Sequence, residues 1–285
     1  MDSSKFKIVL IVVFVILITG VGALFYFQQE TPSTEPQDEG LMLYSSFINI
    51  HLEPEASDEM EYHWANLEEL MRLADQYEML LVLHFSESWA TYALENEDRL
   101  NEVRSWESDG HEIGLHHHGT SHANWDGYSN EISAKKEDDY KGTIVDLMEI
   151  MNQLPVSGQI LSASMTNEDT DWPEGVIYRT SNEGGELGPT PAEMVGFPKS
   201  ETWNGYDVTW LGKMGYNMAR LQIQITLEMI EEFIFKAEEG EVMGLVLNDD
   251  SMEEDMAKIE ELFSSFQEWE VPVQTVTDIL DDYPY

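Results

Sequence analysis

The chain contains no cysteine and few basic residues, and each shortage excludes a class of protein. Without cysteine the fold cannot use disulfides, and any metal site must be built from histidine, aspartate and glutamate. Only 14 Lys and Arg residues stand against 56 Asp and Glu residues, which gives a formal net charge of −42. A surface this negative repels other polyanions, so we expect no nucleic-acid partner.

The acidic excess also makes a prediction about the conditions in which the protein works. Hydrophobic residues form 42% of the sequence, which is ample for a core and argues against an acidic disordered chain. Mutual repulsion of the carboxylates weakens a compact fold unless counterions screen it. We therefore expect a halophilic protein from a salt-loving source.

Long apolar runs are absent except for one near the N-terminus. Residues Ile8–Phe27 carry no charge, and a helix of this length spans about 30 Å, the thickness of a bilayer core. Lys5 and Lys7 precede the run, so the positive-inside rule places segment 1–7 in the cytoplasm and the rest of the chain outside. The sequence thus predicts a single-pass cell-membrane protein whose partner is the lipid bilayer.

A cleaved signal peptide is the alternative interpretation of this run. Val21-Gly22-Ala23 would serve as a cleavage site with small residues. The run is long for a signal peptide, however, and Phe25-Tyr26-Phe27 is typical of an aromatic belt at the membrane surface. A retained anchor is favoured, and both interpretations export the domain that follows.

A short acidic linker separates the anchor from the folded domain. Residues 28–40 hold two prolines, several acids and no large apolar residue, a composition that cannot bury enough surface to fold. Residues 41–285 are numerous enough for one barrel-sized domain, and no second linker or internal repeat divides them.

Strand and helix patterns alternate along this domain. Short apolar runs predict strands at Leu41–Leu52, Met79–Phe85, Glu112–His118, Gln159–Met165, Glu241–Leu247 and Val271–Val276. Helical spacing of apolar residues predicts helices around Trp64–Ala74 and at Trp89–Trp106, Asp138–Leu154, Leu227–Glu239 and Met252–Glu268. Residues 167–215 are expected to form long loops with short strands near Gly175–Thr180 and Met194–Phe197.

This alternation indicates an α/β fold with a parallel sheet covered by helices, closed as a barrel or open and doubly wound. Either arrangement places ligands at the carboxyl ends of the strands. The polar residues at the ends of predicted strands, or just beyond them, are His51 and Glu53, His84, the group from His116 to His122, and Asn248 with Asp249.

Five of the eight histidines fall within the segment GHEIGLHHHGTSH, residues 110–122. On a strand His116 and His118 face one side and His117 the other, while His122 follows where a loop can curl over the strand end. Neutral imidazoles held this close suit a divalent cation, preferably zinc. The alternative is a hydrogen-bonded histidine cluster without metal, and the placement at a strand end favours the metal.

The same segment resembles the metal-binding motif of polysaccharide deacetylases of the NodB type, known as carbohydrate esterase family 4. In that family a Gly-His-Glu-Ile-Gly strand leads to two histidines separated by three residues. The resemblance implies a distorted (β/α) barrel that binds a divalent metal and removes acetyl groups from N-acetylated sugars. It extends by position to Phe47–Pro54 and to Gly240–Leu280.

Carried over to this chain, the resemblance implies metal ligation by His118 and His122, with His116 as an alternative ligand or a supporting partner. Where the family has two adjacent aspartates, a ligand and a base, this chain has His51 and Glu53. Glu53 would be the oxygen ligand and His51 the base, or the reverse.

The last strand departs from the family pattern. The family's general-acid histidine corresponds to Asn248, followed by Asp249, and asparagine donates a hydrogen bond but cannot deliver a proton. Arg179 is only a loose candidate for the family's arginine. We therefore weigh three functions: a deacetylase of cell-surface polysaccharide, an impaired relative that binds glycan or metal without turnover, and a surface structural protein.

Overall fold

The computed structural model describes residues 44–53, 59–122, 124–165, 169–181, 195–215 and 226–283, without some side chains early in the helix that begins at Asp249. Every described residue belongs to one compact unit, which spans residues 41–285. The predicted stub, anchor and linker (1–7, 8–27 and 28–40) lie outside the described residues. Within the described part, no helix is both long enough and apolar enough to cross a bilayer.

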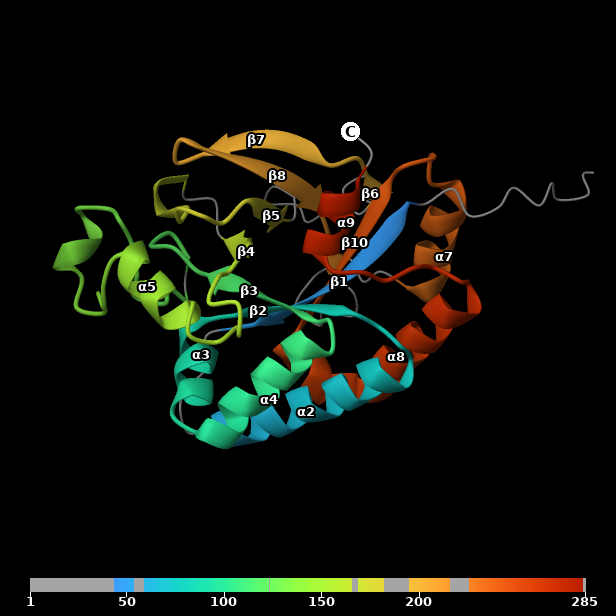
Figure 1. Cartoon of the computed structure of the whole chain (residues 1–285), viewed down its shortest axis with the longest axis horizontal. Helices are drawn as coiled ribbons and strands as arrows, with labels where there is room; N and C mark the ends of the chain where they lie inside the picture. Colours follow the sequence, from blue (N-terminus) through green and yellow to red (C-terminus); the bar gives the residue numbers. More distant parts are fainter. Residues whose placement is uncertain are drawn as a thin grey trace, which may run out of the picture. The chain divides into compact units, whose positions relative to one another are not determined.

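The domain is built on a parallel sheet, as the alternating pattern predicted. Seven strands lie side by side and parallel: β10 (Val242–Asn248), β1 (Ser45–Leu52), β2 (Leu81–Phe85), β3 (Glu112–His117), β4 (Ser162–Met165), β5 (Tyr178–Ser181) and β8 (Tyr206–Gly212) (Figure 1). Two antiparallel strands flank them: β6 (Val195–Gly196) beside β10, and β7 (Lys199–Trp203) beside β8.

The two ends of the parallel sheet are joined by one stretch of chain. β8 pairs with β5, and after Lys213 the short strand β9 (Met214–Gly215) pairs with β10. Residues 206–215 thus contain the strand at one end of the parallel sheet, β8, and a strand that pairs with the other end, β10, so the sheet curls into a distorted ring. This pairing selects the barrel over the open doubly wound sheet.

Helices pack around the ring. They are α2 (Met60–Gln76), α3 (Glu87–Leu94), α4 (Glu97–Ser108), α5 (Ile144–Met151), α7 (Leu227–Lys236), α8 (Asp249–Glu268) and α9 (Val276–Asp282), with 3-10 turns at Ala134–Lys136 and Asp169–Asp171. Figure 1 shows α2, α4 and α8 on one side of the sheet and the β7–β8 hairpin on the opposite side.

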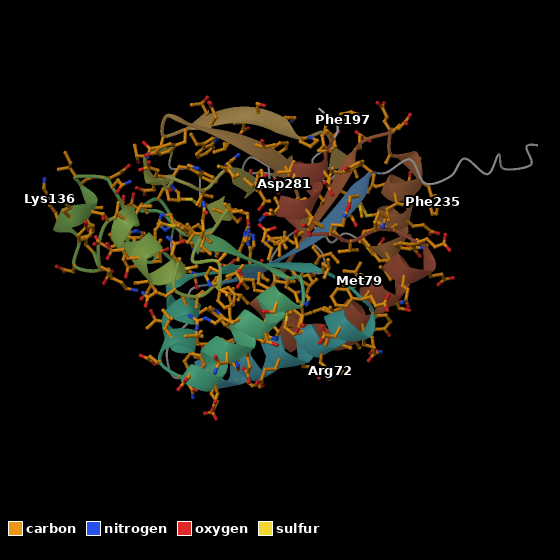
Figure 2. All side chains as sticks on the ribbon, viewed as in Figure 1. Arg72, Met79, Lys136, Phe197, Phe235 and Asp281 are labelled. Carbon is orange, nitrogen blue, oxygen red and sulfur yellow. The ribbon has the colours of Figure 1, made fainter. Side chains whose placement is uncertain are left out.

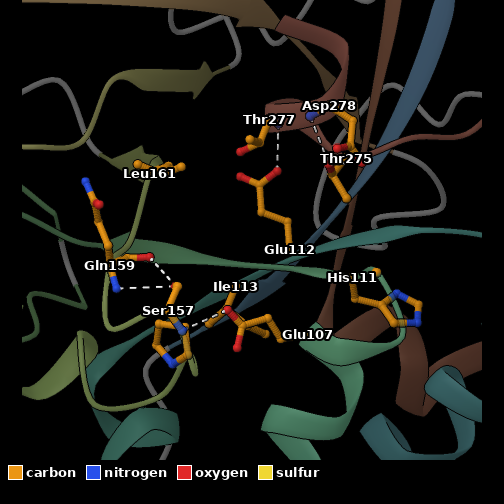
Figure 3. Close-up of a pocket in the computed structure, with 12 residues that line it drawn as sticks. Glu107, His111, Glu112, Ile113, Ser157, Gln159, Leu161, Thr275, Thr277 and Asp278 are labelled. Carbon is orange, nitrogen blue, oxygen red and sulfur yellow. Dashed lines mark hydrogen bonds between the residues drawn. The ribbon is translucent and has the colours of Figure 1, made fainter. Parts of the chain in front are cut away.

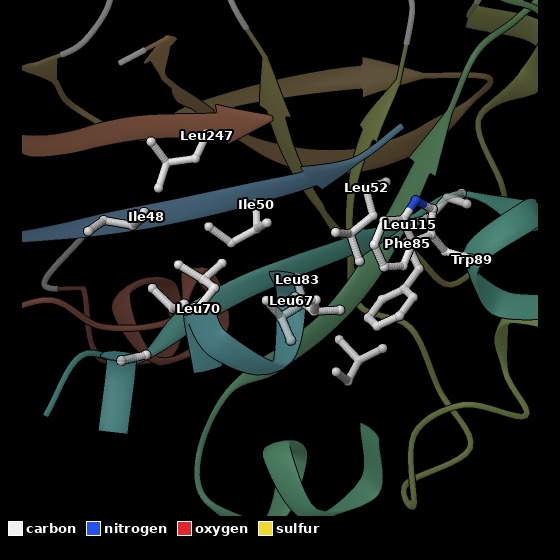
Figure 4. Close-up of a cluster of buried hydrophobic side chains, with 14 of the residues drawn as sticks. Ile48, Ile50, Leu52, Leu67, Leu70, Leu83, Phe85, Trp89, Leu115 and Leu247 are labelled. Carbon is white, nitrogen blue, oxygen red and sulfur yellow. The ribbon is translucent and has the colours of Figure 1, made fainter. Parts of the chain in front are cut away.

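Alternation along β1 separates two environments. Ile48, Ile50 and Leu52 are fully buried in the large core between sheet and helices, where Figure 4 shows Leu67 and Leu70 of α2 packed below the strands. Phe47 instead belongs to a smaller cluster inside the ring. The members of that cluster are Phe47, Val82, Tyr178, Leu211, Val242, Val276, Ile279 and Leu280. Helix α9 thus closes the amino-terminal end of the ring, and polar side chains fill the other end.

Two predicted helices and one predicted strand have different bounds or a different structure in the protein, because a polar side chain caps a helix at each of these places. The expected helix Trp89–Trp106 is two helices, since the Asn96 side chain accepts from the backbone N–H of Asp98 and starts α4 there. Thr143 caps α5, so the helix expected from Asp138 begins only at Ile144. Thr275 caps α9, and the expected strand Val271–Val276 makes just a bridge between Val273 and Ser46 among the described residues.

Part of the predicted loop region is a β-hairpin. Strands β7 and β8 pair antiparallel, and Asn204 and Gly205 connect them with φ angles of 48° and 80°. Positive φ at both central residues defines a type I′ turn, which matches the twist of paired strands. The Asn-Gly pair was the sequence signal for this hairpin. The short strands expected near Gly175–Thr180 and Met194–Phe197 correspond to β5 and β6.

Candidate metal centre

The carboxyl ends of β1 and β3 bring the predicted histidines and carboxylate together. His51 lies at the end of β1 and Glu53 just beyond it, while His116 lies on β3 and His118 follows the strand. In the parallel pairing His51 is level with His84 on β2, and His84 is level with Gly114 on β3. The side chains of His51, Glu53, His116 and His118 therefore meet at one mouth of the ring.

Glu53 is the centre of this group. Its Oε2 lies 3.3 Å from Nε2 of His116 and 3.1 Å from Nε2 of His118, and its Oε1 lies 3.8 Å from Nδ1 of His51. The carboxylate side chain is 19% exposed, so solvent reaches it while the histidines behind it are largely covered. The ligand atoms of His51, Glu53 and His116 all lie within 4.8 Å of one another.

These spacings fit a small divalent cation. A tetrahedral zinc with bonds of about 2.0–2.1 Å separates its ligand atoms by about 3.3 Å, close to the distances between Glu53 Oε2 and the two imidazole nitrogens. Nε2 of His116 is buried and makes no hydrogen bond with the described residues. A buried nitrogen that faces a carboxylate without a hydrogen bond is suited to a metal.

A backbone carbonyl near His118 orients its ring, so that Nε2 faces Glu53. Nδ1 of His118 lies 3.1 Å from the carbonyl oxygen of Asn124. A carbonyl only accepts, so Nδ1 carries a hydrogen, and Nε2 is the nitrogen that has the lone pair whenever the ring is neutral. Metal-binding histidines are oriented by this kind of contact.

The electrostatics favour a charged Glu53 carboxylate beside neutral His51, His84 and His116. Burial would raise the pKa of Glu53, but His116, His118 and His51 together lower it well below its usual range. Burial lowers the pKa of His116, although Glu53 opposes this. Burial, followed by the charge of Lys213, lowers the pKa of His51 and of His84 as well. Neutral histidines are the form that binds a metal.

His122 and the residues of β10 lie at the border of this group. The ring of His122 is 3.9 Å from that of His118, and its Nδ1 accepts from the backbone N–H of Asn124. Asn248 is level with His51 in the β1–β10 pairing, and its Oδ1 is buried without a hydrogen bond to the described residues. Asp249 begins α8, and its side chain lies outside the description.

Sequence reasoning missed Lys213, which lies inside the ring. Its Nζ is within 3.0 Å of side chains from three strands: Asn49 and His51 of β1, Ser164 of β4 and Thr180 of β5. Burial lowers its pKa well below the usual value, and Glu53 opposes this shift. A lysine in the segment Gly212-Lys213-Met214-Gly215, in a chain poor in basic residues, was the available sequence signal.

The role of His117 was also missed. As predicted from the alternation, it faces away from His116, and there Nδ1 lies 2.7 Å from Asp126 and Nε2 lies 3.8 Å from Asp171. Burial would lower its pKa, but the two carboxylates raise it to about 9. Asp126 also accepts from the backbone N–H of His118 at 3.3 Å, so this charged group fixes the start of the loop that carries His118.

Arg179, the loose candidate for the family arginine, is engaged by the β7 hairpin strand. Its Nη1 lies 3.1 Å from Glu201, and its guanidinium stacks 3.9 Å from the ring centre of Trp203. Its neighbour Thr180 is the β5 residue that contacts Lys213, and successive strand residues face opposite sides. Arg179 therefore lies on the outer side of the ring.

A separate pocket lies at the amino-terminal end of the strands. It has a volume of about 250 Å³. Glu112, at the start of β3, points to α9 and accepts a hydrogen bond of 2.9 Å from the backbone N–H of Thr277 (Figure 3). Within the described part of the chain, its lining includes none of the predicted site residues. The histidine group and this pocket lie at opposite ends of β3.

Taken together, these features define an α/β barrel with a cluster of histidines and one glutamate at the carboxyl ends of its strands. No protein-family model matches the sequence, and no curated protein matches it either. The proteins to which this chain is similar are therefore found among the solved structures.

Three solved structures share the fold over most of this chain. A putative polysaccharide deacetylase from Mycobacterium smegmatis matches 86% of this chain and 95% of its own, with 10% identity and a TM-score of 0.51. Puue allantoinase matches 85% and 91%, with 12% identity and a TM-score of 0.52. A 4-alpha-glucanotransferase from Thermococcus litoralis matches 84% of this chain with 13% identity and a TM-score of 0.54, but this chain spans 40% of its length.

At these identities the likeness concerns the fold alone. It supports the NodB-like, polysaccharide deacetylase-like fold that the GHEIGLHHHGTSH segment suggested.

Proposed function

We propose that residues 41–285 form a metal-dependent amide hydrolase that deacetylates N-acetylated polysaccharide at the cell surface. The observation that carries the proposal is the meeting of Glu53 with His116 and His118 at the carboxyl ends of the strands. This end of an α/β barrel is where such folds hold their reacting groups. The deacetylase-like fold supports the choice of substrate class.

The residues present suit a divalent cation, preferably zinc. Held by Glu53, His116 and His118, it would polarise an acetyl carbonyl and lower the pKa of a water at the site. His122, beside His118, is a further ligand candidate from the loop. The site residues that can accept the proton of the attacking water are His51 and the second oxygen of Glu53.

Asn248 limits how this chain could protonate the departing amine. Its amide, level with His51, can donate a hydrogen bond to a carbonyl oxygen but holds no proton for the departing amine. An impaired domain that binds glycan or metal without turnover is therefore the alternative function. Asp249, the next residue, is the nearest further carboxylate in the sequence.

The proposed place of action is the outer face of the cell membrane. The charge-free run Ile8–Phe27 would anchor the chain in the bilayer with the N-terminus inside, and linker 28–40 would let the domain reach polysaccharide near the surface. Protease treatment of sealed right-side-out vesicles that carry the full chain tests this. We expect the domain to be cleaved and segment 1–7 to be protected, and the opposite orientation would expose segment 1–7 and protect the domain.

Metal analysis of the purified full-length chain tests the site. We expect about one zinc or similar divalent ion per chain, with loss in Glu53→Gln and His118→Ala and retention in the control Glu61→Gln, an exposed residue of α2. A native protein without metal, purified without chelators, would refute the metal centre and favour the structural-protein hypothesis.

Acetate release from N-acetylglucosamine oligomers separates the enzyme from the impaired domain. We expect the natural chain to be slow and Asn248→His to be faster, by the ~10²–10⁴-fold that a positioned acid contributes. Robust activity in the natural chain would mean that another group donates the proton. No release from either form, with metal bound, would favour binding without turnover.

A further inference from the structure

His118 lies one residue beyond the strand that leads to the metal centre. The pairing of β3 with β4 ends at His117, opposite Met165, so the sheet holds His116 but not His118. His118 is nevertheless only 5% exposed, and its Nε2 lies 3.1 Å from Oε2 of Glu53. The segment that follows β3 must therefore fix its position.

The segment from His118 to Asp126 is closed by hydrogen bonds between its two ends. The backbone N–H of Asp126 donates to the carbonyl oxygen of His118, and Oδ2 of Asp126 accepts from the backbone N–H of His118, both at 3.3 Å. The other oxygen of this carboxylate accepts from the backbone N–H of Tyr128 at 3.1 Å. Asn124, inside the closed segment, supplies the carbonyl oxygen that orients the His118 ring. Both the backbone and the ring of His118 therefore depend on where Asp126 lies.

Asp126 is itself held from the opposite face of β3. It is only 4% exposed, and its Oδ2 lies 2.7 Å from Nδ1 of His117. Asp171 faces the other ring nitrogen of His117 at 3.8 Å and accepts from the hydroxyl of Ser129 at 2.9 Å. Two buried carboxylates thus share one histidine, but in the described part of the chain only Asp126 also bonds to His118.

We infer that Asp126 is a positioning residue for the metal centre: its carboxylate closes the segment after β3 and so sets how well His118 and Glu53 bind one divalent cation together. Asp126 supplies no ligand atom, and it acts through the backbone and the ring orientation of His118. The effect on the metal rests on the proposed function, whereas the closure of the segment does not.

Equilibrium dialysis of the full-length chain with Zn²⁺ tests the effect on the metal. In Asp126→Asn one carboxylate oxygen becomes an amide nitrogen, which cannot accept, so the backbone N–H of His118 or that of Tyr128 loses its acceptor. We expect the affinity for Zn²⁺ to fall by about 10–100-fold, as for other residues that orient a metal ligand. An unchanged affinity in a folded Asp126→Asn would overturn the inference.

Asp171→Asn is the matched control. It also alters a buried carboxylate that faces His117, so it carries a similar cost in stability, but it leaves both bonds between Asp126 and His118 in place. Its affinity for Zn²⁺ should stay close to that of the natural chain. Equal losses in the two variants would show that the effect passes through His117 or through general destabilisation, and would contradict the role of Asp126.

Amide hydrogen exchange of the metal-free full-length chain tests the closure directly. We expect the backbone N–H groups of His118 and Asp126 to be protected in the natural chain before any metal is added, and to exchange faster in Asp126→Asn but not in Asp171→Asn. Protection that develops only with Zn²⁺ would mean that the metal orders this segment, and would refute the inference even if Asp126→Asn fails to fold. If the natural chain binds no Zn²⁺, the proposed function fails, while the exchange data still decide whether Asp126 holds the segment.

Discussion

At the residue scale, neighbouring histidines differ because a strand turns successive side chains to opposite faces. His116 faces Glu53 inside the ring, where burial lowers its pKa. His117, the next residue, faces Asp126 and Asp171, whose charges raise its pKa to about 9 despite burial. His116 is therefore suited to metal binding, and His117 is suited to carrying a positive charge at neutral pH.

This charge predicts a pH dependence of stability. The folded-state pKa of His117, about 9, lies above the unfolded value of about 6.5, so its contribution is complete below pH 6.5 and is lost as the pH rises through 9. The difference corresponds to roughly 3 kcal/mol at 1.36 kcal/mol per pKa unit. In urea unfolding with chelator present, we expect His117→Gln to be much less stable than the natural chain at pH 6, with the gap narrowing towards pH 10.

A second buried histidine provides the control. Burial lowers the pKa of His111, so its contribution does not decrease as the pH rises above 6.5. The gap between His111→Gln and the natural chain should therefore not narrow over the same range. A gap for His117→Gln that stays constant from pH 6 to 10 would show that the imidazole is not held charged.

At the scale of elements, β3 must pass unusually close to its neighbours. A Cβ on Gly114 would lie 2.2 Å from Cδ2 of His84 and 2.8 Å from the hydroxyl of Ser162. His84 in turn contacts that hydroxyl at 3.0 Å, so there is little room for either side chain to move. Glycine at this position lets the histidine of β2 lie across the ring interior.

We therefore expect Gly114→Ala to destabilise the domain by about 1–3 kcal/mol or more through overpacking, measured by chemical denaturation. Gly196→Ala is the matched control, because its Cβ would meet nothing within 4 Å, and it should be nearly neutral. In a His84→Ala background the cost of Gly114→Ala should fall. An equal cost in both backgrounds would mean that the clash with His84 is not the cause.

The elements also show where sequence patterns were sufficient. Apolar runs located β1, β2, β3 and β10, because a parallel strand that is buried on both faces consists of a nearly unbroken run of hydrophobic residues. Residues 199–212 lacked such a run, and only the turn signal Asn204-Gly205 marked them as a hairpin. The segment before α9 resembled a strand because Val271, Val273 and Val276 are β-branched, but the Thr275 cap and packing inside the ring made Val276 the start of a helix.

At the scale of the whole molecule, negative charge dominates. Some basic side chains at the surface are paired with the abundant acids, for example Arg72 with Glu69 on α2 and Lys141 with Glu87. Figure 2 shows Arg72 and Lys136 at the periphery. A net charge of −42 leaves most carboxylates without such a partner.

The folded state is therefore expected to gain from salt. Raising the ionic strength from 0.1 to 1 M shortens the Debye length from about 10 to 3 Å and screens repulsion between surface carboxylates. The melting temperature of the natural chain should rise by several degrees between these conditions. Glucose at equal osmolarity controls for osmolyte effects, and a melting temperature indifferent to salt would remove the basis for predicting a salt-loving source.

The sequence by itself determined the alternation of strands and helices outside residues 167–215 and before Val271, the polar ends of β1 and β3, and the donor types available to a metal, because these depend on residue identity and on local alternation. It also predicted that histidines from the end of β3, with His118 and His122 as the first choice and His116 as the alternative, would lie near His51 and Glu53, since carboxyl ends of parallel strands share one edge. Only the tertiary structure decided that Lys213 contacts His51 across 162 residues of sequence. That contact depends on which strand closes the ring, and ring closure is a non-local pairing that no local pattern encodes.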